Sequence, residues 1–170
     1  MGTPFVTAHR VLTSGVVSRL APGSLAGQAV LVAGAVGNAA IQLARSAGAT
    51  VITTVSSDRK ARSARAAGAH HVVNYREGDT TAAIKAIAPE GIDLVAEVAP
   101  APNAALDLAV TRVHSTLAVY ADNGGDELVL PLRVTFRSGP KLAATKQDSR
   151  RQHAGTPKSD RWGPASAAAS

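Results

Sequence analysis

A short glycine-containing segment offers the clearest chemistry in the sequence. It reads Val32-Ala33-Gly34-Ala35-Val36-Gly37-Asn38 and lies between an aliphatic run and a predicted helix. Such a turn can bring backbone N–H groups and a helix N-terminus to a pyrophosphate. Only two glycines of a G-x-G-x-x-G pattern are present, and Val32 stands at its first position. The placement favours dinucleotide binding over the alternative, a helix start whose glycines only permit close packing.

The segment after the next predicted strand indicates which dinucleotide is preferred. An acidic residue there would accept hydrogen bonds from the ribose hydroxyls of NAD. The sequence instead reads Thr54-Val55-Ser56-Ser57-Asp58-Arg59-Lys60. Hydroxyls followed by cations suit a 2′-phosphate, so the pattern favours NADP(H). The alternative is a helix N-cap at Ser57 followed by a solvated helix face.

Other reactive residues do not form a catalytic or metal-binding motif. His70 and His71 are adjacent, so on a strand they would point to opposite faces and could not chelate one metal. Asp93 and Glu97 would share a face but lie roughly 13 Å apart, too far for paired-carboxylate catalysis. The chain has no cysteine, which excludes disulfides, thiol catalysis and cysteine-ligated zinc. It also has no G-x-S-x-G elbow, Walker lysine or Tyr-x-x-x-Lys pair.

Aliphatic runs alternate with helical patterns through most of the chain. This alternation predicts βαβ units and an α/β fold, a Rossmann-like doubly wound parallel sheet of about five strands. Ser57 and Asp79 are predicted to cap the second and third helices of the sheet region. The predicted strands cover 29–32, 51–55, 71–75, 92–98 and 116–120, and the predicted helices cover 38–47, 57–67, 79–88 and 103–110.

Composition and charge separate a neutral body from a basic tail. The chain has 170 residues, 45% of them hydrophobic and 3% aromatic, which predicts one domain with an aliphatic core. Residues 1–132 hold ten Lys/Arg and ten Asp/Glu, so the net charge of +6 comes from the last 38 residues. A neutral body is not typical of nucleic-acid-binding domains. With no signal-like start and no run long enough to span a membrane, we expect a cytoplasmic protein.

The domain organisation follows from this division. Residues 1–28 are interpreted as a linker and helix, 29–132 as the dinucleotide-binding domain and 133–170 as a low-complexity tail. The tail is rich in Ser, Arg, Lys, Pro, Gly and Ala, and it has few large apolar residues. It cannot bury enough surface to offset the entropy of ordering, so we expect disorder from about residue 138.

Several segments resemble one known family. GAVGNAAIQLA at 34–44, AGATVI at 47–52 and GAHHVVNY at 68–75 are similar to the zinc-free quinone oxidoreductase branch of the medium-chain dehydrogenase/reductase superfamily. IDLV at 92–95 resembles its fourth strand, and GTPFVTA at 2–8 resembles the segment that leads from its catalytic domain into its cofactor domain. The likeness covers about residues 1–132, the cofactor-binding domain alone.

The resemblance implies a function and a set of contacts. In this branch NADPH passes a hydride to a quinone or enone-like acceptor, without zinc. The contacts to the 2′-phosphate and adenine map onto Ser56, Lys60 and Tyr75, and the threonine on the nicotinamide side maps onto Thr7. The catalytic residues stay unassigned, because acceptor contacts lie largely in a catalytic domain that this sequence does not show.

The sequence also departs from the family. About three residues are missing between the first strand and Gly34, and the turn at 112–115 has no glycine. The sixth strand, on which a family-like homodimer would depend, is expected to be lost after Arg133. These departures suggest a truncated protein. The alternative function is a non-catalytic nucleotide-binding fragment, and a third hypothesis is an interaction protein with a basic tail.

Overall fold

The protein is built around one parallel β-sheet. The computed structural model describes residues 3–15, 17–33, 37–125 and 127–144. The strands are β1 (Ala29–Ala33), β2 (Thr50–Val55), β3 (His71–Asn74), β4 (Ile92–Glu97), β5 (Thr111–Val119) and β6 (Lys141–Ala144). The helices are α1 (Thr3–Thr13), α2 (Gly37–Ser46), α3 (Asp58–Ala66), α4 (Thr80–Ile87), α5 (Pro100–Val110) and α6 (Leu132–Ser138). The strand order is β3-β2-β1-β4-β5-β6, and every pair is parallel. The predicted Rossmann-like fold is therefore confirmed.

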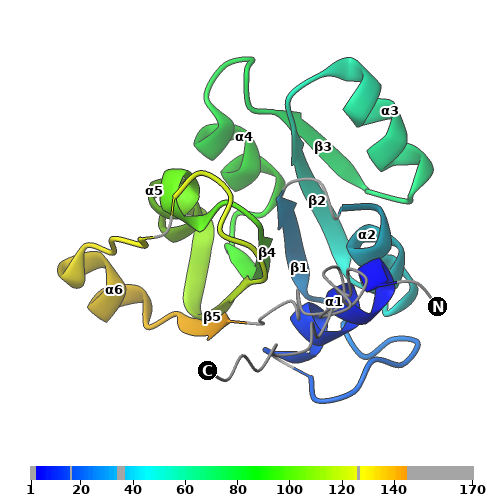
Figure 1. The fold of residues 1–170 in the computed structure, drawn as a ribbon, viewed down its shortest axis with the longest axis horizontal. Coiled ribbons are helices and arrows are strands. Elements are labelled where there is room, and N and C mark those ends of the chain that lie inside the picture. The colour runs from blue at the N-terminus through cyan, green and yellow to red at the C-terminus, as the bar shows by residue number, and fades with distance from the viewer. Residues whose placement is uncertain (1–2, 16, 34–36, 126, 145–170) are drawn as a thin grey trace, which may run out of the picture.

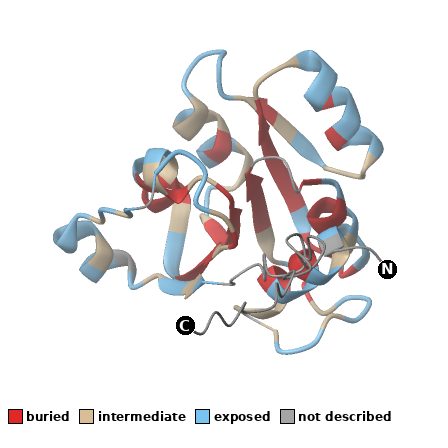
Figure 2. Cartoon of the chain, viewed as in Figure 1, coloured by how far each residue is buried: buried red, intermediate tan, exposed pale blue. Residues whose placement is uncertain are grey.

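Helices cover both faces of the sheet (Figure 1). On one face, side chains from α1, α2 and α3 form a core with Leu94 and Ala96 of β4. On the other face, side chains from α4 and α5 form a second core with Ile92 and Val95. The central strands are buried from both sides, as Figure 2 shows. Uninterrupted aliphatic runs are typical of such strands, which explains why the sequence signalled them clearly.

Helix caps fix where the elements begin. The Ser57 side chain accepts a hydrogen bond from the backbone N–H of Lys60, and the Asp79 side chain accepts one from Ala82. Both predicted caps are confirmed. α5 begins at Pro100, earlier than predicted, because proline suits the first turn of a helix. None of the helices in the described part of the chain is long and apolar enough to cross a membrane.

The C-terminal boundary needs a correction. The prediction that the sixth strand is lost and that disorder begins near residue 138 is wrong for 138–144. The short α6 leads to β6, which pairs with β5 in the register Leu117 to Leu142. β6 is an edge strand with mostly exposed side chains, so it left no apolar pattern to detect. The rest of the expected tail, 145–170, lies outside the described residues.

The glycine-free turn predicted before the fifth strand lies within β5, and it is strained. His114 has a φ of 62°, a left-handed conformation that costs a non-glycine residue about 1–2 kcal/mol. Glycine relieves that strain but loses more entropy on folding. We therefore expect His114→Gly to raise the free energy of unfolding by about 0.5–1 kcal/mol. Chemical denaturation measures the change.

The neighbouring residue provides a matched control for this prediction. Val113 is exposed, is also in β5, and does not have a positive φ. Val113→Gly should therefore lower the free energy of unfolding, because it adds entropy without relieving strain. A loss of stability in both variants would show that the left-handed conformation of His114 is not costly.

Candidate functional site

The sheet changes winding direction between β1 and β4, which are neighbours in its centre. The chain leaves β1 for α2 on one face and leaves β4 for α5 on the other. Val32 pairs with Ala96, so Ala33 and Glu97 end side by side. In open α/β sheets, ligands bind in the crevice outside the carboxyl ends of the strands at such a point.

The predicted phosphate turn begins at this crevice. Gly34, Ala35 and Val36 follow β1 directly, and they lie outside the described residues. Gly37 is the first residue of α2 and is buried. Among the described residues, a Cβ at Gly37 would come within 4 Å of Ile41, whose Cδ1 would lie at 3.6 Å, which is ordinary contact.

The structure brings together the residues predicted to hold the 2′-phosphate. The Lys60 ammonium donates a hydrogen bond to the Ser56 hydroxyl at 2.9 Å, across the first turn of α3. Tyr75 follows β3, and its backbone N–H donates to the carbonyl of Val55 at the end of β2. The Tyr75 side chain is 52% exposed, so its ring is open to a planar partner. A hydroxyl, a cation and an exposed aromatic ring thus lie at the carboxyl ends of two adjacent strands.

Thr7 belongs to a different part of the site. It is buried on α1, which packs against α2 and contacts β4 and β5. Just after α1, a Cβ at Gly15 would lie 2.7 Å from the hydroxyl of Thr116, near the middle of β5. Ser56, Lys60 and Tyr75 lie instead around the ends of β2 and β3.

A buried carboxyl cluster of Glu97 and Asp107 was missed from the sequence, in which Glu97 was weighed only against Asp93 and found too distant from it. Glu97 Oε1 accepts hydrogen bonds from the backbone N–H groups of Val98 (2.8 Å) and Ala99 (2.6 Å). The Asn103 amide donates to both carboxylate oxygens of Glu97. Asp107 lies on the same helix as Asn103 and is fully buried. A lone acid among the apolar residues of α5 was the signal available in the sequence.

The cluster changes the ionisation of its members. Burial and the nearby charge of Glu97 raise the pKa of Asp107 to about 8. Burial and the Glu97 charge also raise the pKa of Tyr120 above its usual range.

Asp93 has a separate role at the other end of β4. Its carboxylate forms an ion pair with Arg112 at 2.8 Å and accepts a hydrogen bond from the backbone N–H of Ala29. The prediction that Asp93 and Glu97 do not act together agrees with this arrangement.

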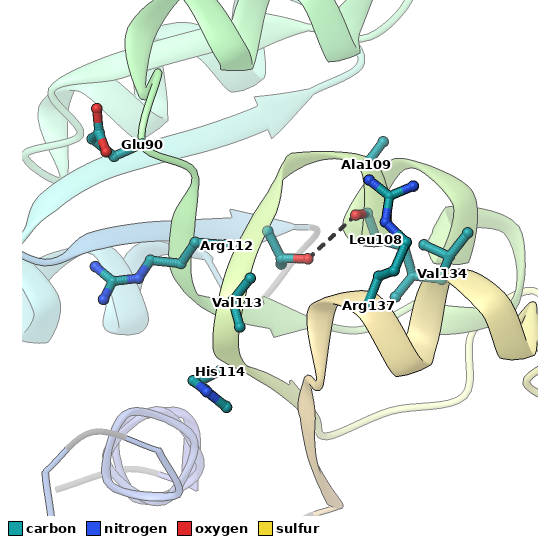
Figure 3. A pocket seen from close by; sticks show the side chains of 9 residues that line it. Glu90, Leu108, Ala109, Arg112, Val113, His114, Val134 and Arg137 are labelled. Atoms are coloured by element: carbon teal, nitrogen blue, oxygen red, sulfur yellow. Dashed lines mark hydrogen bonds between the residues drawn. The ribbon is translucent and has the colours of Figure 1, made fainter.

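Two cavities lie at the opposite, amino edge of the sheet. The larger, about 820 Å³, is lined by residues of α5, β5 and α6 together with Glu90. Figure 3 shows that Arg112 and Arg137 point away from each other there. The smaller cavity, about 300 Å³, contains Asp93 and Arg112, which already neutralise one another. Because Arg112 and Arg137 diverge in the larger cavity and the smaller cavity adds only Lys141 to the paired Asp93 and Arg112, the carboxyl edge is the stronger candidate.

Within the described residues, no set of donors fits a zinc site. Zinc needs a close set of Cys, His or carboxylate ligands. The chain has no cysteine, and the residues whose structure is described contain no group of three His, Asp or Glu that could hold a metal. His70 Nδ1 accepts a hydrogen bond from the Val51 N–H at 2.9 Å, a structural role. Burial and the nearby Arg45 and His71 lower the pKa of His70, which keeps it a neutral acceptor.

Comparison with known proteins agrees with this architecture. The profile of the zinc-binding dehydrogenase family matches residues 35–148. Human quinone oxidoreductase is 30% identical over 153 residues, which are 88% of this chain and 42% of that protein. An NAD-dependent alcohol dehydrogenase structure superposes with a TM-score of 0.75 at 28% identity, over 89% of this chain and 44% of that one.

A further structure shows the fold alone. Escherichia coli quinone oxidoreductase, solved in complex with NADPH, superposes with a TM-score of 0.67 at 23% identity, over 86% of this chain and 44% of that one. The chain therefore spans less than half the length of each relative described. The family profile continues to residue 148, so the expectation that the likeness ends near Arg133 is wrong.

Proposed function

The chain belongs to the zinc-binding dehydrogenase family, as a quinone oxidoreductase-like segment of the medium-chain dehydrogenase/reductase superfamily, and from this premise we propose that it binds NADPH for hydride transfer to a quinone or enone-like acceptor. The cofactor would lie across the carboxyl edge of the sheet, over the crevice between β1 and β4. Bound NADPH supplies the hydride, and this chain's residues hold and orient the cofactor.

The contact between Lys60 and Ser56 carries the proposal. Its ammonium and hydroxyl lie together at the end of β2, where this fold places the adenosine ribose. A 2′-phosphate there would gain one cationic and one neutral hydrogen bond. The names of the relatives do not decide between NAD and NADP, since one is NAD-dependent and another was solved with NADPH. The preference for NADPH therefore rests on the residues of this chain.

Tyr75 and Thr7 are assigned to the two ends of the cofactor. The exposed Tyr75 ring lies beside the end of β2, where it would pack against the adenine. Thr7 lies on α1, which contacts β4 and β5 on the other side of the crevice, where the nicotinamide would lie. The turn at Gly34, Ala35, Val36 and Gly37 would take the pyrophosphate between them.

Two nucleotide fragments test the 2′-phosphate site directly. Adenosine 2′,5′-bisphosphate and 5′-AMP differ only in the 2′-phosphate. Calorimetry should show that the bisphosphate binds about 10- to 100-fold more tightly, the range expected for hydrogen bonds to a charged group. Whole NADPH should exceed NADH by a similar factor. Equal affinities for the two fragments would reject the 2′-phosphate site, and no binding of any of the four would reject the dinucleotide site.

A turnover assay separates the two candidate functions. Oxidation of NADPH by a quinone supports the oxidoreductase. Tight NADPH binding without turnover by any quinone or enone supports the non-catalytic nucleotide-binding protein.

A further inference from the structure

Glu97 at the end of β4 and Asp107 on α5 are carboxyl groups that are almost completely removed from solvent. Glu97 is 0% exposed and Asp107 is 1% exposed. Glu97 has donors on both of its oxygens, from the turn after β4 and from Asn103. Neither oxygen of Asp107 has a hydrogen-bond donor in the part of the chain that the structure describes. A buried carboxylate without any donor would be very unfavourable.

The helix explains why Asp107 meets Glu97. Asn103 and Asp107 are four residues apart on α5 and therefore share one helix face. Since Asn103 donates to Glu97, that face is directed at the Glu97 carboxylate. Two ionised carboxylates can only accept hydrogen bonds, so the pair can bond only when one of them keeps a proton. Glu97 already accepts from several donors, so the proton belongs on Asp107.

We propose that Asp107 is a positioning residue for the dinucleotide site: its protonated carboxyl donates to Glu97 and so holds the turn from β4 into α5 at the edge of the crevice. The inference rests on the proposed function, because it assigns this turn to the cofactor cleft. Asp107 would act on the turn through Glu97, which accepts hydrogen bonds from the N–H groups of Val98 and Ala99. Glu97 ends β4 beside Ala33, at the start of the phosphate turn.

The pH dependence has a definite sign. The pKa of Asp107 is raised to about 8 from its usual value of 3.8, chiefly by burial and then by Glu97. The folded state therefore holds this proton more tightly than the unfolded chain does. Its contribution to stability is complete below about pH 4 and is lost as the pH rises toward 8. Above that pH the pair carries two buried negative charges, and the turn loses its support.

Among the described residues, the titratable groups on the elements around the pair are neutral or exposed to solvent. Tyr120, after β5, is buried near Glu97 and stays neutral over this pH range. Lys85 on α4 and Asp122 in the loop after β5 are exposed to solvent. Arg137 of α6 lines the cavity near the C-terminal end of α5, with Leu108 and Ala109. Burial of Asp107 and the charge of Glu97 raise the pKa of the Asp107 carboxyl.

Asp107→Asn keeps the shape of the side chain but removes its dependence on a titrating proton. The amide of asparagine can donate to Glu97 at every pH, as the protonated acid does only at low pH. We expect the variant to melt at least about 4 °C above wild type at pH 8.5, with the difference shrinking toward pH 5. Asp93→Asn is the control, since it removes a carboxylate from the other end of β4 that already has a cation partner. The melting temperature of Asp93→Asn at pH 8.5 should not exceed that of wild type.

Amide exchange tests the positioning role without any cofactor. In wild type, the protection factors of the Val98 and Ala99 amides should fall at least about tenfold between pH 6 and pH 9, beyond the intrinsic effect of pH. Asp107→Asn should remove that fall. Glu97→Gln provides a second variant, because it leaves one charge fewer in the pair and should also flatten the profile. Protection that is independent of pH in wild type would overturn the inference.

Cofactor titration tests whether the protonation of Asp107 affects the affinity for NADPH. Wild type should bind NADPH more weakly at pH 9 than at pH 7, and Asp107→Asn should bind it equally at both. If no variant binds NADPH at any pH, the proposed function fails, while the melting and exchange data still decide whether the carboxyl pair holds the turn. If NADPH binds with the same pH profile in wild type and Asp107→Asn, the positioning role is overturned.

Discussion

Replacing Gly91 by alanine should lower the free energy of unfolding by about 2–5 kcal/mol. Gly91 forms the turn between α4 and β4, with a φ of +88°. A Cβ there would lie 2.8 Å from the backbone nitrogen of Arg112 and 3.0 Å from its Cα. A left-handed alanine costs about 1–2 kcal/mol, and the overlap with a neighbouring backbone adds about 1–3 kcal/mol. Urea denaturation at constant pH measures the loss.

Gly78 provides the matched control for this substitution. Its φ is +72°, but a Cβ there would meet no atom of the described residues within 4 Å. Gly78→Ala should therefore cost only the conformational part, about 1–2 kcal/mol. The difference between the two variants isolates the contact between the Gly91 turn and β5. If both variants lose the same stability, that close approach is not a constraint on the start of β4.

The sequence predicted well those elements whose residue types depend directly on burial or on helix capping. The central strands are buried on both faces, so their aliphatic runs are continuous, and α3 and α4 begin at residues with a strong capping preference. Ser56 and Lys60 could be placed together because both flank the start of one helix. Their contact is local, spanning four residues.

The features that were missed depend on long-range packing or on the backbone alone. β6 is an edge strand whose pairing with β5 uses backbone groups, and its side chains are mostly exposed. The prediction of disorder followed the basic composition of this region, because backbone pairing leaves no pattern of side chains in the sequence. The Glu97 and Asp107 pair joins a strand end to the middle of the following helix, and only the packing angle of α5 brings the two together.

Replacing Lys60 by alanine should weaken NADPH binding by about 1.5–3 kcal/mol, roughly 10- to 150-fold, and should hardly change NADH binding. The Lys60 ammonium already lies on the Ser56 hydroxyl, so a phosphate at that place would meet both groups. NADH has no 2′-phosphate to lose the contact. Asp58 opens α3, where its charge complements the helix dipole. Calorimetric titration of both cofactors against wild type and variant measures the effect.

Arg62→Ala is the control for the loss of a positive charge. Arg62 is exposed on α3 two residues after Lys60, and thus about 200° around the helix. Screening at physiological salt limits the effect of a charge on the far side, so this variant should bind NADPH nearly as wild type does. Equal losses in the two variants would mean that general electrostatic attraction, not a phosphate site, favours NADPH. Equal losses for NADPH and NADH in Lys60→Ala would show that Lys60 supports the fold of the cleft rather than the 2′-phosphate.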